Sequence, residues 1–204
     1  MFVLVENDSI TKTVSSNRGI TIGENQYPQA IFSAAWSTAE REAIGLYEVV
    51  FDNSNKKDEK YYTNTNQSFN FADGVATASF GSATAKELDD RNATDQNGVE
   101  LDPVVIIEGL KTKHKNIIKR QASGLLAPTD WYVIKATDVE SYSVPSAVTT
   151  FRANVRTKSN EMETAIDNAS DVDALATLYA YVNTGTEENP VMERPLGEWP
   201  ELGV

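Results

Sequence analysis

Hydrophobic and polar residues alternate in short runs over the first ninety or so residues of the chain. The runs are rich in β-branched and aromatic side chains and are bounded by Asn, Asp or Gly, a pattern typical of short β-strands. They cover residues 2–5, 19–22, 46–51, 61–63 and 75–80. This pattern predicts a small mixed sheet.

One short helix is predicted between these strands. Ser37 and Glu40 have the spacing of a capping box, in which the Glu side chain reaches back to the amide of the cap residue. Gly45 stands where a left-handed stop residue belongs. We therefore expect a helix of two turns over residues 38–44.

After Pro103 the hydrophobic period changes from two residues to about 3.6, the period of an α-helix. The first predicted helix has about 22 residues, stops before Pro128 and carries Ile106, Ile107, Leu110, Ile117, Ile118, Ala122, Leu125 and Leu126. The second starts at Ser146, after Pro145, and carries Val148, Phe151, Val155, Met162, Ala165, Ile166 and Ala169. The third is short, follows the capping sequence at 170–173, and carries Leu175, Leu178, Tyr179 and Val182.

These patterns predict an α+β protein. A small N-terminal β-rich mixed sheet with one short helix precedes a C-terminal domain of about three helices and an extended C-terminal tail. The polar stretch at 52–60 is interpreted as a hairpin loop, and the Asp-, Asn- and Gly-rich stretch that ends at Pro103 as a linker. The expected boundaries are a β-rich α+β domain over 1–91, a linker over 92–103, a helical domain over 104–183 and a tail over 184–204. The helices should pack as an intramolecular bundle, and self-association through part of their surface stays open.

Composition narrows the chemistry that the chain can perform. It has 204 residues with 18 Lys and Arg, 30 Asp and Glu, one His and no Cys, for a net charge of −12. The lack of Cys excludes disulfides, thiol catalysis and thiolate metal sites, and one His cannot form a multi-histidine site. We expect no cofactor and no metal. The acidic balance disfavours nucleic acid as a partner, and no apolar run approaches the roughly 18–20 residues of a membrane span.

Two clusters of charged residues are interpreted without catalysis. The first predicted long helix carries Lys111, Lys113, His114, Lys115, Lys119 and Arg120. We interpret Lys111, Lys115 and Lys119, which are spaced four residues apart, as a solvated face or as a face that meets an acidic surface of a neighbouring copy. His114 is interpreted as a surface histidine. The acidic pairs Asp89/Asp90 and Glu161/Glu163 lack the geometry of an acid–base site, because the first lies in the predicted linker and the second points in two directions from a helix. No catalytic residue is expected, and the chain is not expected to be an enzyme.

One segment is more specific. It has the form R-x4-LLA-x-TDW, followed by VPS and by an aromatic residue before R-x3-R. The residues concerned are Arg120, Leu125, Leu126, Thr129, Asp130, Trp131, Pro145, Phe151, Arg152 and Arg156. This segment resembles the tail assembly chaperone and tail fibre assembly-like proteins of tailed bacteriophages, and so do residues 36–50 and the closing Glu198-Trp199-Pro200.

The resemblance implies a protein of the phage tail. It would be a virion-associated component of the tail fibre or baseplate region, assembled in the host cytoplasm, with other tail proteins as partners and a homo-oligomer as a further possibility. One alternative is a soluble assembly chaperone that is absent from the mature particle. Another is a carbohydrate-binding tail protein with exposed Tyr61, Tyr62, Phe69 and Phe71, although such residues can also alternate into the core of a sheet.

The physical role of the motif can be predicted from its residue types. Thr129 and Asp130 follow the Pro that ends a helix, and their side chains can cap the freed backbone amides. Trp131 would carry a large apolar area onto the bundle. We therefore expect Leu125, Leu126, Trp131 and Phe151 to be core residues.

Five residues are candidates for contacts with a partner. Trp199 lies in a polar tail without a local core, where a Trp docks into a groove on its own domain or on another chain. Leu196 and Leu202 flank it. Arg152 and Arg156 are four residues apart on one helix face, so they can grip a carboxylate-rich partner or pair with the chain's own acidic residues.

Overall fold

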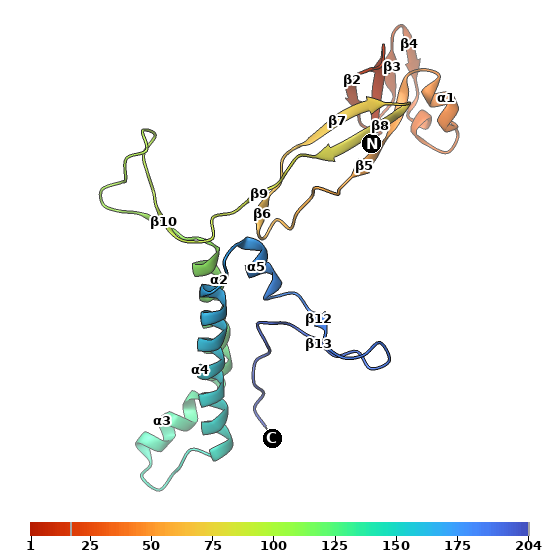
Figure 1. Ribbon diagram of the computed structural model, residues 1–204. Coiled ribbons are helices and arrows are strands. Elements are labelled where there is room, and N and C mark those ends of the chain that lie inside the picture. Colours follow the sequence, from red (N-terminus) through yellow and green to blue (C-terminus); the bar gives the residue numbers. More distant parts are fainter. Residues whose placement is uncertain (17, 204) are drawn as a thin grey trace. The chain divides into compact units, whose positions relative to one another are not determined.

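The computed structural model describes residues 1–16 and 18–203, and the chain divides into two compact units, Met1–Thr84 and Ala85–Val204. Strands dominate the first unit and helices the second (Figure 1), which confirms the predicted α+β class. The division falls at Thr84, earlier than the predicted domain end at residue 91, because residues 87–90 are hydrogen bonded to the start of the first long helix.

The first unit is built on a curled five-stranded sheet with the strand order β2-β1-β5-β8-β7. Its strands are β1 (Phe2–Glu6), β2 (Ser9–Val14), β5 (Leu46–Asp52), β7 (Gln67–Ala72) and β8 (Val75–Phe80). Neighbouring strands are antiparallel except for the parallel pair β5–β8. Asp73 and Gly74 join β7 to β8 and both have positive φ, the conformation of a two-residue hairpin turn.

Shorter elements accompany this sheet. They are β3 (Ile20–Ile22), β4 (Asn25–Tyr27), the 3-10 helix η1 (Gln29–Phe32), α1 (Thr38–Glu42), β6 (Tyr62–Thr63) and β9 (Thr84–Ala85). The predicted capping box is confirmed, since the Glu40 amide donates to Ser37 Oγ at 3.3 Å and the Ser37 amide donates to Glu40 Oε2 at 2.8 Å. Gly45 has the predicted positive φ, 77°. The helix ends at Glu42, two residues before its predicted end at residue 44.

The core of the first unit lies on both faces of the sheet. Side chains alternate along β1, so Phe2 and Leu4 belong to one hydrophobic cluster and Val3 and Val5 to another. The first cluster also holds Val14, Ile20, Ile31 and Leu46. The second holds Val49, Ala76 and Ala78, with Ile10, Tyr47, Phe69 and Phe71 packed against it.

Two long helices, α2 (Leu110–Leu126) and α4 (Ser146–Asp167), lie side by side and form the centre of the second unit (Figure 1). The 3-10 helix η2 (Ala127–Thr129) leads from α2 into α3 (Asp130–Asp138), and α5 (Val172–Thr177) follows α4. The predicted starts of two helices are confirmed. Helix α4 begins directly after Pro145. Helix α5 is capped by Asp171, whose Oδ1 accepts from the Ala174 amide at 2.7 Å. The apolar face predicted for the second long helix is buried at Val148, Phe151, Val155, Met162 and Ile166, and Ala169 just beyond the end of α4 is buried as well.

The first long helix starts later than predicted. Ile106 and Ile107 form β11 (Ile106–Ile107), which pairs antiparallel with β10 (Arg91–Asn92). Residues 92–103, predicted as a linker, instead comprise Asn92 of β10 and most of the loop between the two strands. We call residues 91–107 the 91–107 arm. Helix α2 begins only after Gly109, whose carbonyl accepts from the Lys113 amide at 3.2 Å.

The predicted tail is not extended throughout. Strands β12 (Val182–Asn183) and β13 (Met192–Glu193) form a hairpin, which we call the 182–193 hairpin. After it the Leu196 amide donates to the Leu178 carbonyl at 3.0 Å, and the Leu196 side chain is buried. The three predicted helices correspond to α2, α4 and α5. Helix α3 was not predicted, and none of its side chains is buried.

Candidate protein-interaction site

Arg152, a candidate partner contact, is bound by its own chain. Its Nη1 donates to the Leu126 carbonyl at 3.0 Å and to Thr129 Oγ1 at 2.6 Å, and it lies 2.8 Å from Asp130 Oδ1. The Arg152 side chain is only 11% exposed. The guanidinium therefore fastens the turn between α2 and α3 to α4. Of the two alternatives left open for Arg152, the structure shows pairing with the chain's own acidic residue.

Thr129 and Asp130 are predicted to cap backbone amides with their side chains. In the structure the side chain of Thr129, the N-cap residue of α3, makes no capping hydrogen bond. Thr129 is 3% exposed, donates its hydroxyl to the Leu126 carbonyl at 2.7 Å, and accepts from Arg152. The cause is that η2 carries the chain into α3 without a break, so this turn has few free amides to cap. The corner predicted from the TDW motif is present, but Arg152 holds it.

Trp131 is half exposed, at 50%, and the prediction that it is a core residue is wrong. Its ring packs on that of Tyr132, with centroids 3.8 Å apart, and Lys135 Nζ lies 5.9 Å from the Trp131 ring centroid. Helix α3 has no buried side chain, so no layer covers the helix that carries Trp131. Phe151 is buried as predicted, and Leu125 and Leu126 are half-buried against its cluster.

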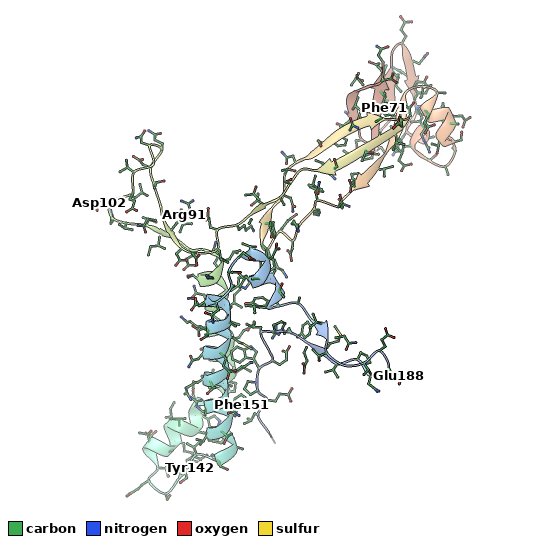
Figure 2. The ribbon with its side chains drawn as sticks, in the orientation of Figure 1. Phe71, Arg91, Asp102, Tyr142, Phe151 and Glu188 are labelled. Atoms are coloured by element: carbon green, nitrogen blue, oxygen red, sulfur yellow. The ribbon has the colours of Figure 1, made fainter. Side chains whose placement is uncertain are left out.

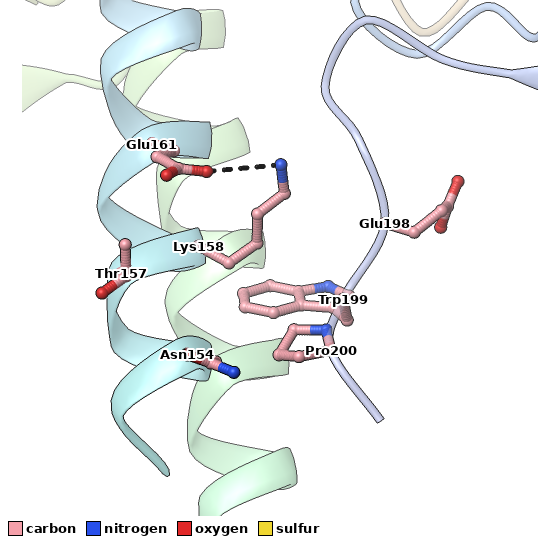
Figure 3. Close-up of a pocket in the computed structure, with 7 residues that line it drawn as sticks. All are labelled: Asn154, Thr157, Lys158, Glu161, Glu198, Trp199 and Pro200. Atoms are coloured by element: carbon pink, nitrogen blue, oxygen red, sulfur yellow. Dashed lines mark hydrogen bonds and ion pairs between the residues drawn. The ribbon is translucent and has the colours of Figure 1, made fainter. Parts of the chain in front are cut away.

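Trp199 docks onto the helical pair of its own chain. It packs against the cluster of Ala122, Phe151 and Val155, and its Nε1 donates to Gln121 Oε1 at 3.2 Å. Figure 3 shows the indole ring beside α4, next to Pro200. Of the two docking modes left open for this Trp, the structure shows the one within the chain.

The other three predicted contact residues differ in their exposure. Leu196 is 2% exposed, so it is a core residue and not a partner contact. Arg156 is exposed and donates to the Arg152 carbonyl at 3.3 Å. Leu202 is exposed near the C-terminal end. Only Arg156 and Leu202 of the five candidates stay accessible, apart from the half-exposed edge of Trp199.

A small groove lies beside Trp199 on α4 (Figure 3). An ion pair lines it, with Lys158 Nζ 3.5 Å from Glu161 Oε2. Gly197 closes over Lys158 with a positive φ of 75°, so this turn in the chain favours glycine. The remaining lining residues are Asn154, Thr157, Glu198, Trp199 and Pro200. The groove offers amide and charged groups around one aromatic face.

The lysines of α2 pair with acidic residues of the same chain. Lys115 Nζ lies 2.6 Å from Asp167 Oδ1, and Lys119 Nζ lies 3.5 Å from Glu163 Oε2. The four-residue step forward on α2 matches a four-residue step back on α4, as expected of antiparallel helices. Lys111 pairs with Asp89 at 3.0 Å. These three lysines are therefore not a free solvated face.

Asp90 caps helix α2. Its carboxylate accepts from the Gly109 amide at 2.8 Å and from the Thr112 hydroxyl at 2.9 Å. The Leu110 amide donates to the Glu87 carbonyl at 2.9 Å and the Lys111 amide to the Leu88 carbonyl at 3.0 Å. The hydrogen bond from Gly109, with that from Thr112, holds the pKa of the Asp90 carboxyl below its ordinary value. The Asp89/Asp90 pair is thus explained by helix capping and an ion pair.

His114 is half-buried rather than a free surface histidine. Its ring lies against that of Tyr179, with centroids 4.9 Å apart. Among the residues that the structure describes, no group of three or more His, Asp or Glu side chains could hold a metal ion. Within the same residues no helix is both long and apolar enough to cross a membrane.

The 91–107 arm carries an exposed apolar surface that the sequence prediction missed. Six apolar side chains of this arm are exposed, from 37% at Leu101 to 62% at Val99. The others are Val104, Val105, Ile106 and Ile107. In a ribbon of two strands neither face is covered by another layer, so neighbouring residues are exposed on opposite faces. The β-branched run Val104–Ile107 was the signal for a strand, but its spacing also fitted the start of a helix.

The arm is held at its base and at its tip. The Ala93 amide donates to the Val105 carbonyl at 2.7 Å. At the tip, Asp95 Oδ1 accepts from the amides of Asn97 at 2.8 Å and Val99 at 3.0 Å, and Gly98 has a positive φ. Figure 2 labels Arg91 near the base of the arm and Asp102 in its outer part. The arm is therefore a structured ribbon with local hydrogen bonds.

The 182–193 hairpin repeats this exposure. Tyr181, Val182, Val191 and Met192 are each about half exposed, and Glu188 is labelled near the tip in Figure 2. The Thr184 amide donates to the Val191 carbonyl at 2.8 Å. The second unit thus presents two ribbons with uncovered apolar side chains.

The aromatic residues proposed for sugar stacking turn largely inward. Tyr61 is 7% exposed, Tyr62 is half-buried, and Phe69 and Phe71 pack against the second cluster of the sheet. Phe69 and Phe71 alternate with exposed residues along β7, as expected of a strand with one face toward the core.

No family model matches the chain, and no curated protein or solved structure is found to be similar to it.

Proposed function

We propose that this chain is a non-enzymatic bacteriophage tail protein, a virion-associated component of the fibre or baseplate region that acts through protein–protein contacts. The observation that supports it best is the exposed apolar surface of the 91–107 arm. Large apolar side chains left exposed in this number on one short segment are typical of interaction sites in soluble proteins. The resemblance of residues 119–156 to phage tail assembly proteins supplies the class of partner.

The helical pair suits a platform for such contacts. Arg152 fastens the α2–α3 turn, and Asp90 with the carbonyls of Glu87 and Leu88 fastens the start of α2. The 91–107 arm is therefore displayed from a base that is hydrogen bonded on both sides. A rigid base reduces the entropy lost when the arm binds a partner.

Quantitative mass spectrometry of density-purified particles, produced from the genome that encodes the chain, tests the proposal. We expect the chain in the particles at a fixed ratio to a known tail protein. Ile106→Asp places a charge on the exposed arm, and we expect this variant to stay folded and to be lost from the particles. Lys60→Asp is the matched control, because Lys60 lies in the exposed 52–60 loop.

If the chain is abundant in the lysate and missing from the particles, it is a soluble assembly chaperone and the virion proposal is wrong. The chaperone alternative also uses apolar contacts, so the arm variant does not separate it from the virion proposal. The presence or absence of the chain in the purified particles separates these two functions.

A further inference from the structure

The 91–107 arm has a charge as well as an apolar surface. The arm contains Asp95, Glu100 and Asp102, and its one cationic residue in the sequence is Arg91 at its base. Asp95 is engaged in the turn at the tip of the arm. Glu100 and Asp102 are exposed and lie on either side of the exposed Leu101. The surface is therefore both apolar and acidic.

One face of α2 complements it. Lys113, Ile117, Arg120 and Gly124 recur at helical spacing, so they share one side of the helix. All four are exposed, and a Cβ added to Gly124 would meet no atom within 4 Å. Lys111, Lys115 and Lys119 pair with acidic residues of the chain, whereas Lys113 and Arg120 form no salt bridge within the described residues. We call this surface the basic α2 face.

From this complementarity we infer that the basic α2 face of one copy binds the 91–107 arm of a second copy of the chain. Glu100 and Asp102 oppose Lys113 and Arg120, and the exposed β-branched residues of the arm cover Ile117 and the open surface at Gly124. Lys113 and Arg120 lie about 10 Å apart along the helix. Glu100 and Asp102 are two residues apart in the chain, a separation of at most about 7 Å, and the long basic side chains span the difference.

A second copy is inferred as the occupant because each copy carries both the acidic arm and the basic α2 face. At a net charge of −12 two copies repel each other, so contact requires a local pair of opposite surfaces. Each copy has both surfaces in its second unit. Association is then reciprocal in a dimer or head-to-tail in a ring, and the measured mass distinguishes these two forms. This inference goes beyond the proposed function and does not depend on it.

Charge exchange tests the contact in the full-length chain. The variant Lys113→Glu/Arg120→Glu reverses the basic α2 face, and Glu100→Lys/Asp102→Lys reverses the arm. Sedimentation velocity should show concentration-dependent association of the wild type, weakened about tenfold or more in dissociation constant in either variant alone. A mixture of the two variants should associate again, because each contact between them is once more between opposite charges. Added salt should weaken the wild-type association.

Two results would overturn the inference. One is a wild type that stays monomeric at every concentration and at low salt. The other is a mixture of the two variants that associates no better than either variant alone, which would mean that the surfaces do not meet. The double variant Lys12→Glu/Lys60→Glu makes the same change in net charge at exposed positions of the first unit, and it should leave the association unchanged or slightly weaker. A chain that is monomeric yet present in particles would refute this inference and leave the proposed function standing.

Discussion

Arg152 on α4 and Asp130 at the start of α3 lie 2.8 Å apart, with the guanidinium also bonded to the Leu126 carbonyl and the Thr129 hydroxyl. One side chain thus satisfies three acceptors at the turn between two helices. Both charged residues belong to the motif that the sequence singles out between Arg120 and Arg156. Their contact gives that motif a structural reason within this chain.

Replacing Arg152 should destabilise the helical unit. Arg152→Met keeps the length of the side chain but leaves Thr129 and the Leu126 carbonyl without this donor, and we expect a loss of about 1–3 kcal/mol in the free energy of unfolding. Urea titration followed by the helical signal in circular dichroism measures it. Arg156→Met is the matched control on the exposed side of α4 and should change this free energy by less than about 0.5 kcal/mol. Equal effects of the two variants would contradict the role given to Arg152.

The two tryptophans of the second unit should behave differently. Trp199→Ala removes an indole from the cluster around Phe151 and Val155, and we expect a loss of about 2 kcal/mol in the free energy of unfolding, since Trp199 is only partly buried. Trp131→Ala should cost less than about 1 kcal/mol, because its side chain is half exposed. Limited proteolysis should cleave the C-terminal segment faster in Trp199→Ala alone. The reverse order of stability would show that Trp199 is not docked.

Two glycines in and beside α2 give opposite predictions. A Cβ on Gly109 would lie 2.4 Å from the Asp89 carbonyl oxygen, so Gly109→Ala should push the 87–90 segment off the helix and cost about 1–3 kcal/mol. Gly124 lies in an exposed part of the helix with open space around it. Gly124→Ala should stabilise the unit by about 0.5–1 kcal/mol. Thermal unfolding of both variants at low protein concentration provides the comparison, and a stabilising Gly109→Ala would contradict the close approach.

Acid should loosen the start of α2. The folded pKa of Asp90 lies below its ordinary value of about 3.9, so its contribution to stability is complete above that value and is lost as the pH falls through the lower folded pKa. Asp90→Asn keeps an acceptor for the Gly109 amide without a charge to titrate. We expect the stability of the wild type to fall more steeply than that of Asp90→Asn between about pH 5 and pH 2. Parallel pH curves of the two proteins would show that the cap contributes no pH dependence.

Local features of this fold could be predicted from the sequence, and long-range ones could not. The capping box of Ser37 and Glu40 and the cap at Asp171 are confirmed because each depends only on residues within three positions. Ile106 and Ile107 were misassigned to a helix because their spacing fits both periods. Their strand is decided by a pairing with Arg91 and Asn92, which lie far upstream in the sequence.

The same limit applies to the candidate site. A Trp in a motif has a preference for burial, but only the direction of α3 decides whether Trp131 finds a neighbour. The lysines of α2 looked like a solvated face because their partners Asp167 and Glu163 come from another helix. The exposure of the arm could be recognised only after its strands were paired.

The chain leaves and re-enters the helical unit at almost one point, because Arg91 pairs with Ile107 at the base of the arm. The loop between Arg91 and Ile107 can change in length without moving the start of α2, because the hydrogen bonds that hold this start come from residues 87–90. The closure entropy of such a loop grows only slowly with its length. The turn at Asn97-Gly98 is therefore a site at which a peptide tag or a fluorescent domain can be grafted while the α2/α4 scaffold folds unchanged.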